Sequence, residues 1–321
     1  MRRSTFIDWE ATRPWIDLPG ADIDAFVSRL PETFDFDIGA KLRQWHEHGI
    51  VVFERAASHA VIDEYLKDLE HLRAYHTNYE LTVESAGVSK PIQQFTRTEL
   101  DDDRIKFNLV HSISRAACRL SLTREVCQFL RCVFDSPPCV LQSLTFFRGS
   151  QQPIHIDYPY VREQMKLAHL AASWVALEDI DPAAGPLAYY PGSHRSDVMG
   201  YFDWGNGSIL MEPDSTRTPG EFARYLDDRV RQAKIEPNVF CPRKGDVLIW
   251  HGALAHGGTP IVRPELTRKS YVTHYTSLDA YPPMHMRPNA LKTGDYYAEN
   301  GGYAFHLPWL KSTARLPSWT A

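Results

Sequence analysis

Hydrophobic residues recur with a helical period in the first third of the chain. Ile38, Leu42 and Trp45 follow one another at intervals of four and three residues, which places them on one face of a helix. Asp37 is a typical N-cap residue and Gly49 a typical residue at a helix end, so they mark the expected limits. Two more helices with one apolar face are expected, over residues 61–72 and over residues 126–133 with Thr123 as N-cap.

Short β-rich segments separated by turns replace this pattern from about residue 139, and an early one covers residues 50–53. Many short strands are typical of a sandwich or barrel. The order of elements therefore predicts a mainly β protein with flanking helices, whose core is a double-stranded β-helix of the jelly-roll type. The later strands are expected at residues 140–147, 153–157, 169–177, 187–190, near 239, at 246–250 and at 270–275.

Residues 1–321 are expected to form a single domain. A mainly helical support, about residues 1–138, precedes a β core of about residues 139–276. An insertion with a helix near residues 221–233 interrupts the core at about residues 197–237, and it is either a substrate lid or peripheral packing. The tail, residues 277–321, is rich in Pro, Gly and aromatic residues and is expected to lie back on the fold, near the mouth of the site.

Composition and charge exclude several classes of function. The net charge is −5 and the basic residues are scattered, so nucleic acid is not an expected partner. The sequence has neither a long apolar run for a membrane span nor the apolar stretch of a secretory signal. Five cysteines form no C-x-x-C pair, which favours a cytoplasmic protein with buried, reduced thiols. The oligomeric state stays open.

The segment around His155 and Asp157 contains an H-x-D motif. Side chains at i and i+2 of a strand point the same way, so both can reach one metal ion. An imidazole and a carboxylate are two thirds of the two-histidine, one-carboxylate set that holds non-haem Fe(II). The alternative is that local hydrogen bonds alone hold the two side chains.

A third ligand is expected from the distant segment that contains His251 and His256. His256 precedes two glycines, where the backbone can approach a ligand closely. His251 competes with it, and its alternative role is that of a buried supporting residue. Arg268 follows, and a guanidinium inside a barrel requires a carboxylate partner such as a dicarboxylate co-substrate. The alternative for Arg268 is a surface ion pair.

Five ordered segments together resemble the phytanoyl-CoA dioxygenase family, over about residues 35–276. The most specific is the stretch from Gly185 to Arg195, which is similar to the family's GPL…PGSH signature. The PGSH segment belongs to the framework in this family, so we interpret its His194 as structural. The other segments are residues 49–53, the H-x-D motif at 155–157, residues 174–179, and residues 245–257.

The resemblance implies Fe(II) with 2-oxoglutarate and O2 as co-substrates. It assigns His155, Asp157 and His256 to iron, and thereby prefers His256 to His251. It assigns Arg268 to the distal carboxylate of 2-oxoglutarate. Gln142 and Trp174 lie where family members line the co-substrate pocket, although a buried core position is the alternative for Trp174.

One departure from the family pattern concerns the residue two positions after the distal histidine. It is often polar in the family but is Gly258 here, so Thr259 is a candidate to replace its hydrogen bond. Asp157 argues against a halogenase, in which this coordination position is free for chloride.

The expected activity is hydroxylation of a small-molecule substrate with release of succinate and CO2. Desaturation or ring formation would use the same site. The rivals are a non-catalytic binding protein on this fold and a zinc-dependent hydrolase. Aromatic residues that could form an apolar wall for a lipid-like, polyketide or amino-acid-derived substrate are Phe147, Tyr158, Tyr160, Tyr201 and Trp204.

Overall fold

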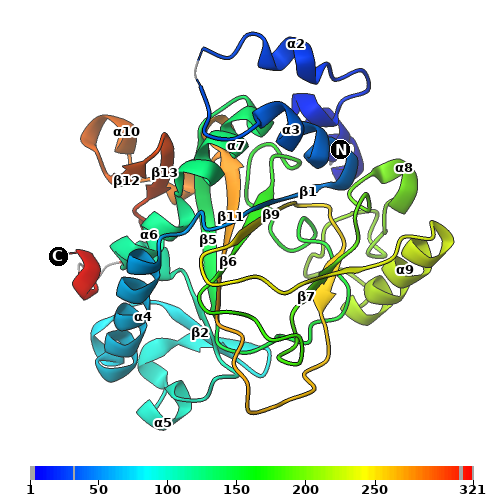
Figure 1. Ribbon diagram of the computed structural model, residues 1–321. Helices are drawn as coiled ribbons and strands as arrows, with labels where there is room; N and C mark the ends of the chain where they lie inside the picture. Colours follow the sequence, from blue (N-terminus) through cyan, green and yellow to red (C-terminus); the bar gives the residue numbers. More distant parts are fainter. Residues whose placement is uncertain (1–3, 32, 311–313, 320–321) are drawn as a thin grey trace.

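The computed structural model describes residues 4–31, 33–310 and 314–319 of the chain. A ten-stranded sheet and a three-stranded sheet form its centre, and helices pack around them (Figure 1). The expected mainly β class with flanking helices is therefore confirmed. Among the described residues, none of the helices combines the length and the apolar character that a membrane crossing requires.

The large sheet brings distant parts of the chain together. Its main path runs β1 (Ile50–Phe53), β9 (Val247–His251), β6 (Ala171–Ala176), β11 (Ser270–Ser277), β5 (Pro138–Phe146), β4 (Lys106–Asn108), β2 (Thr82–Ser85) and β3 (Val88–Pro91). The hairpin of β12 (Tyr296–Glu299) and β13 (Gly302–Phe305) joins it beside β5. The small sheet has the order β10 (His256–Gly258), β7 (Leu187–Tyr189) and β8 (Asn238–Phe240).

The three helices expected from periodicity are present. In α3 (Ile38–His48), the Asp37 carboxylate accepts a hydrogen bond from the Ala40 N–H at 2.8 Å, and Gly49 ends the helix with a φ of 70°. The second and third are α4 (His59–Ala74) and α7 (Arg124–Phe134). Thr123 occupies the expected N-cap position of α7, but its side chain makes no capping hydrogen bond.

The remaining helices are short, apart from one in the insertion. That helix, α9, begins with a capping box between Thr218 and Glu221. The bounds are α1 (Thr5–Ala11), α2 (Ile23–Val27), α5 (Arg97–Leu100), α6 (Arg115–Ser121), α8 (Ser196–Met199), α9 (Pro219–Gln232) and α10 (Ala290–Thr293).

Two regions differ from the expected secondary structure. The first third is not only helical, because β2, β3 and β4 extend the large sheet from within it. Residues 153–157 form no regular strand: only His155 makes an isolated bridge, and a turn follows Asp157. The strands β2, β3 and β4 are too short for their alternation to be recognised, and residues 153–157 have only one residue paired with a distant segment.

A large hydrophobic cluster joins the helices to the outer side of the large sheet. Trp45 of α3 meets Phe129 of α7 with ring centroids 5.5 Å apart, and Tyr65 of α4 meets Tyr271 of β11 at 5.1 Å. In Figure 1, α3 and α7 lie above the central strands, α4 lies at the lower left, and α8 and α9 lie on the right. The helices therefore support the sheet from outside and leave its inner face to the site.

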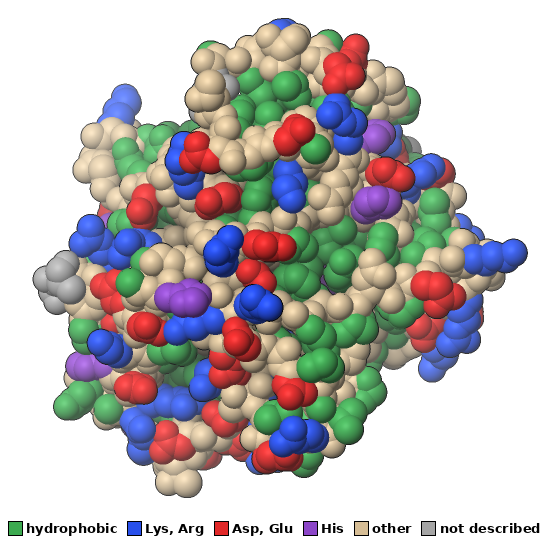
Figure 2. Space-filling model, in the orientation of Figure 1, with side chains coloured by type: hydrophobic (Ala, Val, Ile, Leu, Met, Phe, Trp, Pro, Cys, Tyr) green, Lys and Arg blue, Asp and Glu red, His purple; other side chains and the backbone are tan. Residues whose placement is uncertain are grey.

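The surface is electrostatically mixed. On the face that Figure 2 shows, acidic and basic side chains lie next to one another over most of the area. This mixing agrees with the net charge of −5 and with the scattered basic residues.

Candidate metal centre

A single antiparallel bridge between two remote segments builds the centre. The backbones of His155 and His256 exchange two hydrogen bonds, each 2.9 Å long. Asp157 follows two residues later and points to the same side. One ligand atom from each of His155, Asp157 and His256 lies within 4.8 Å of the others, which makes the three a candidate metal-binding set.

Backbone carbonyl groups orient both imidazoles. Nδ1 of His155 lies 2.9 Å from the Pro153 oxygen, and Nδ1 of His256 lies 2.9 Å from the Leu254 oxygen. A carbonyl oxygen only accepts, so each Nδ1 carries the hydrogen and each Nε2 keeps its lone pair. The lone pair of Nε2 is what a metal ligand requires.

The carboxylate of Asp157 is held through one oxygen. The Trp250 indole N–H donates to Oδ2 at 2.7 Å, and Nε2 of His274 lies 3.5 Å from the same oxygen. The other oxygen, Oδ1, lies 3.7 Å from Nε2 of His256. This arrangement leaves Oδ1 to bind a metal as a monodentate ligand.

The surroundings of His155 and Asp157 shift both pKa values in the direction that metal binding requires. It lowers the pKa of His155 to about 3, with a further contribution from His256, so the imidazole is neutral at physiological pH. Burial acts to raise the pKa of Asp157, but the neighbouring histidines His256, His274 and His155 lower it well below its usual range. Two imidazoles and one carboxylate fit Fe(II) by donor type.

Arg268 reaches the same cavity from just before β11 and is only 3% exposed. Burial lowers its pKa to about 10, so the guanidinium stays charged at neutral pH. One Nη donates to the Arg148 carbonyl at 3.3 Å, whereas the buried Nε has no hydrogen-bond partner among the described residues. The surface ion pair considered as its alternative is therefore wrong. A carboxylate from a bound ligand would satisfy the buried charge.

The two other co-substrate candidates take different positions. Trp174 lines the cavity, with its ring 5.6 Å from the Arg268 guanidinium carbon. Gln142 does not line it, but its amide lies 3.2 Å from Nδ1 of His274, which does. If the amide N–H donates to Nδ1, the hydrogen of His274 lies on Nε2 and faces Asp157.

Trp250 and His274 are site residues that the motifs did not indicate. His274 lies six residues after Arg268, an even spacing that puts both on one face of the strand. Trp250 alternates with His251 along β9 in the same way, and only Trp250 faces the cavity. Strand alternation is therefore the signal that could have found both.

Gly258 has no room for the polar side chain that relatives often carry there. A Cβ at this position would lie 2.7 Å from the Gln151 nitrogen and 3.1 Å from the Ser150 hydroxyl. The hydroxyl of Ser150 thus lies beside the space that such a side chain would take, and Ser150 lines the cavity. The expected replacement, Thr259, instead donates to the Pro186 carbonyl at 2.9 Å.

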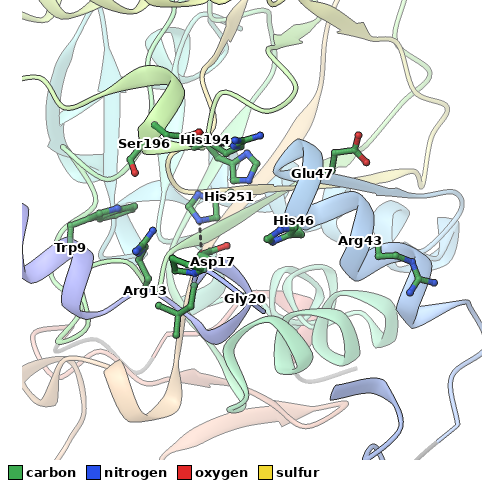
Figure 3. A pocket seen from close by; sticks show the side chains of 14 residues that line it. Trp9, Arg13, Asp17, Gly20, Arg43, His46, Glu47, His194, Ser196 and His251 are labelled. Atoms are coloured by element: carbon green, nitrogen blue, oxygen red, sulfur yellow. Dashed lines mark hydrogen bonds and ion pairs between the residues drawn. The ribbon is translucent and has the colours of Figure 1, made fainter. Parts of the chain in front are cut away.

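His251 and His194 lie in a separate pocket of about 760 Å³ (Figure 3). The Nδ1 of His251 accepts from the Ala253 N–H at 3.0 Å, and its Nε2 lies 3.1 Å from a carboxylate oxygen of the partly buried Asp17. Burial acts to raise the pKa of Asp17, but His251 and then His194 lower it. His251 therefore supports the N-terminal segment and takes no part in the metal-binding set.

Several expectations about the surroundings of the site are wrong. None of the described residues of the insertion (197–237) or of the tail after residue 277 lines the cavity at the metal-binding set or its opening. The insertion packs peripherally in a cluster with Trp9, and the tail does lie back on the fold beside β5. Phe147, Tyr158, Tyr201 and Trp204 form no wall of the site either; only Tyr160 lines the opening.

The fold and the site together define a class, a double-stranded β-helix protein with a candidate two-histidine, one-carboxylate metal centre. The family model for phytanoyl-CoA dioxygenase (PhyH) matches residues 45–269. The chain therefore belongs to the phytanoyl-CoA dioxygenase family. No curated protein sequence matches it.

Solved structures share the fold at low sequence identity. EctD from S. alaskensis in its apo form is 17% identical, with a TM-score of 0.55 over 79% of this chain and 82% of that one. The carbocyclase SnoK from nogalamycin biosynthesis is 17% identical, with a TM-score of 0.54 over 81% and 90%. The epimerase SnoN from the same biosynthesis is 18% identical, with a TM-score of 0.53 over 87% and 96%.

Proposed function

We propose that this protein is an Fe(II)- and 2-oxoglutarate-dependent dioxygenase that hydroxylates a small molecule and releases succinate and CO2. The observation that carries the proposal is one cavity shared by two buried features. The set of His155, Asp157 and His256 lies on its wall, together with the charged Arg268, whose Nε has no partner among the described residues. A metal ion and a dicarboxylate would complement both.

His155, Asp157 and His256 would hold the iron through Nε2, Oδ1 and Nε2. Arg268 would bind the far carboxylate of 2-oxoglutarate, and Trp174 would pack along the co-substrate. Bound Fe(II) would supply the O2 chemistry that couples decarboxylation of 2-oxoglutarate to oxidation of the substrate. Ser150 would donate the hydrogen bond that Gly258 cannot make.

The structurally similar proteins support the proposed dependence on 2-oxoglutarate, but they catalyse different reactions. EctD is described in complex with 2-oxoglutarate and 5-hydroxyectoine. SnoK and SnoN are described as a carbocyclase and an epimerase, both dependent on 2-oxoglutarate. Hydroxylation is the simplest outcome at such a centre, so we propose it here. The five unpaired cysteines favour a cytoplasmic location.

An anaerobic titration tests the proposal. Apo-protein is titrated with Fe(II) and then 2-oxoglutarate, and the visible metal-to-ligand charge-transfer band is recorded. We expect the band in the wild type, and in Arg268→Ala only at a 2-oxoglutarate concentration at least tenfold higher. Iron binding without the band, together with zinc retained after purification, would favour the hydrolase. Failure to bind Fe(II) would favour the non-catalytic binding protein.

A further inference from the structure

A second cavity of about 930 Å³ opens beside the metal centre. It shares Phe146, Ser150 and Gln152 with the inner cavity, so the two cavities adjoin. We call the outer cavity the vestibule. We propose that Arg148 in the vestibule binds a carboxylate of the substrate, so that the substrate is a small organic acid. This inference rests on the proposed function and specifies its substrate class.

The other cations of the vestibule already have acidic partners. Arg104 forms a two-pronged ion pair with Asp102, whose closest contact is 2.6 Å. Lys106 lies 2.8 Å from Glu84 on the neighbouring strand. Neither side chain needs a ligand to balance its charge.

The acids on the wall are balanced as well. Glu84 is paired with Lys106, and Asp103 lies 3.5 Å from the guanidinium of Arg73. The charge that remains in the vestibule is therefore positive and belongs to Arg148.

Arg148 forms no ion pair among the residues that the structure describes. One Nη donates to the Pro264 carbonyl, and the buried Nε has no hydrogen-bond partner there. The carboxylates of Asp102 and Glu265 are close enough for Arg148 to lower their pKa, yet each pairs with another arginine. The side chain is only partly buried and lines the vestibule, and a planar guanidinium without an acidic partner matches a carboxylate in geometry and charge.

Position connects Arg148 to the proposed chemistry. Its carbonyl oxygen accepts the hydrogen bond from Arg268, and the two arginines line adjoining cavities, Arg148 the vestibule and Arg268 the inner cavity. The inner arginine would bind the co-substrate, and the outer one would bind the substrate. An acid held at Arg148 would extend from the vestibule toward the metal-binding set.

Uncharged donors complete a polar lining. Tyr160 lines the vestibule and brings a phenolic hydroxyl to it. Ser150 and Gln152 add a hydroxyl and an amide to the junction with the inner cavity. A volume of about 930 Å³ is suitable for a compact polar molecule. This lining favours a hydrogen-bonding acid over a lipid-like chain.

Arginine side-chain NMR tests the proposal directly. The sample is full-length protein loaded with Zn(II), as a diamagnetic substitute for iron, and spectra are recorded before and after 2-oxoglutarate is added. The Nε–H signals of Arg148, Arg104 and Arg268 are assigned from single Arg→Lys variants. The sample is then titrated with benzoate, with its uncharged analogue benzamide, and with inorganic phosphate.

We expect 2-oxoglutarate to shift the Arg268 signal and benzoate to shift the Arg148 signal. Benzamide should leave Arg148 unchanged, and benzoate should leave the paired Arg104 unchanged. If Arg268 does not respond to 2-oxoglutarate, the proposed function fails. If Arg268 responds but benzoate does not shift Arg148, or benzamide shifts it equally, only the organic-acid proposal fails. A response to phosphate at lower concentration than to benzoate would replace the carboxylate by a phosphate ester.

Variants give a second, independent readout. In calorimetric titrations of the loaded protein with benzoate, Arg148→Gln should raise the dissociation constant at least tenfold. Arg195→Gln is the matched control, because this exposed arginine pairs with Asp197 and does not line the vestibule. Equal effects of the two substitutions, or none in Arg148→Gln, would overturn the proposal. The charge-transfer band with Fe(II) and 2-oxoglutarate verifies that Arg148→Gln keeps its fold.

Discussion

At the scale of single residues, two histidines five positions apart have opposite surroundings. His256 presents a free Nε2 to the metal-binding set, whereas Nε2 of His251 is 3.1 Å from Asp17 in another pocket. We therefore predict that His256→Ala abolishes the charge-transfer band and lowers turnover of 2-oxoglutarate at least 100-fold. His251→Ala should retain the band and lower turnover less than tenfold.

The stability of the fold, unlike turnover, should depend on His251. His251→Ala leaves Asp17, whose side chain is only 11% exposed, without its hydrogen-bond donor, which should cost roughly 1–3 kcal/mol in denaturant unfolding of the metal-free protein. A larger loss of the band in His251→Ala than in His256→Ala would show that the distal ligand is misassigned.

Trp250 is predicted to control how tightly the centre binds metal. Its indole N–H is the donor at 2.7 Å to Oδ2 of Asp157, and ligand-orienting groups of this kind affect metal affinity by roughly 10–100-fold. Trp250→Phe should therefore weaken Fe(II) binding by about that factor, as measured by anaerobic titration. Trp204→Phe is the control, since this buried indole N–H has no partner among the described residues. Equal Fe(II) affinity in the two variants would remove Trp250 from the site.

At the scale of elements, the segment that leads into the H-x-D motif packs directly on β10. A Cβ at Gly258 would approach backbone atoms of Gln151 to 2.7 and 2.9 Å, so this segment has no room to adjust. Gly258→Ala should lower the free energy of unfolding by roughly 1–3 kcal/mol and raise the 2-oxoglutarate requirement, because Ser150 would move with the segment.

Gly220→Ala provides the matched control within a helix. Its Cβ would meet no atom closer than 3.9 Å, and alanine is the better helix former. Denaturant unfolding should therefore show unchanged or slightly higher stability. If Gly258→Ala is as well tolerated as Gly220→Ala, the close packing of this segment on β10 is not a constraint.

Elements set by local patterns were predictable from the sequence, and elements set by distant pairing were not. The limits of α3 follow from Asp37 and Gly49, which lie in or next to the helix itself. The strands β2, β3 and β4 escaped prediction because they are short and pair mainly with each other and with β5. Their residues alternate too briefly for the period of two to be recognised.

The same distinction applies to the site. The H-x-D motif is local, so sequence reasoning found His155 and Asp157. The wall candidates Tyr201 and Trp204 are aromatic residues whose sequence does not say which cavity they face, and they pack in the peripheral cluster instead. The role of Arg148 depends on the charge pairs around it, which only the folded arrangement defines.

At the scale of the whole molecule, the N-terminal segment supports the centre from behind. Trp9 of α1 packs on Tyr158 with ring centroids 4.2 Å apart, directly after the H-x-D motif. Asp17 bonds His251 at the end of β9, one residue after Trp250. Residues from the beginning of the chain thus hold both segments that contribute metal ligands, although they do not enter the cavity.

Buried neutral histidines make the stability of the whole protein depend on pH. Burial lowers the pKa of His111 to about 3, and burial with a contribution from Lys166 lowers that of His169 to about 4. In the unfolded chain the pKa of a histidine is about 6.5. Between these values only the unfolded state binds the proton, so stability is fully present above about pH 6.5 and is lost as the pH falls.

Each of these histidines should remove roughly 1 kcal/mol of stability between pH 7 and pH 5.5. Denaturant unfolding of metal-free protein at both pH values measures the loss. His111→Asn keeps a polar partner for Ser143 but does not titrate in this range, so its loss should be smaller than that of the wild type by roughly 1 kcal/mol. His59→Gln is the control, because its exposed ring keeps its contact with water in both states. An identical pH dependence in His111→Asn and wild type would show that His111 is protonated in the folded protein, and that its burial is less complete than the structure indicates.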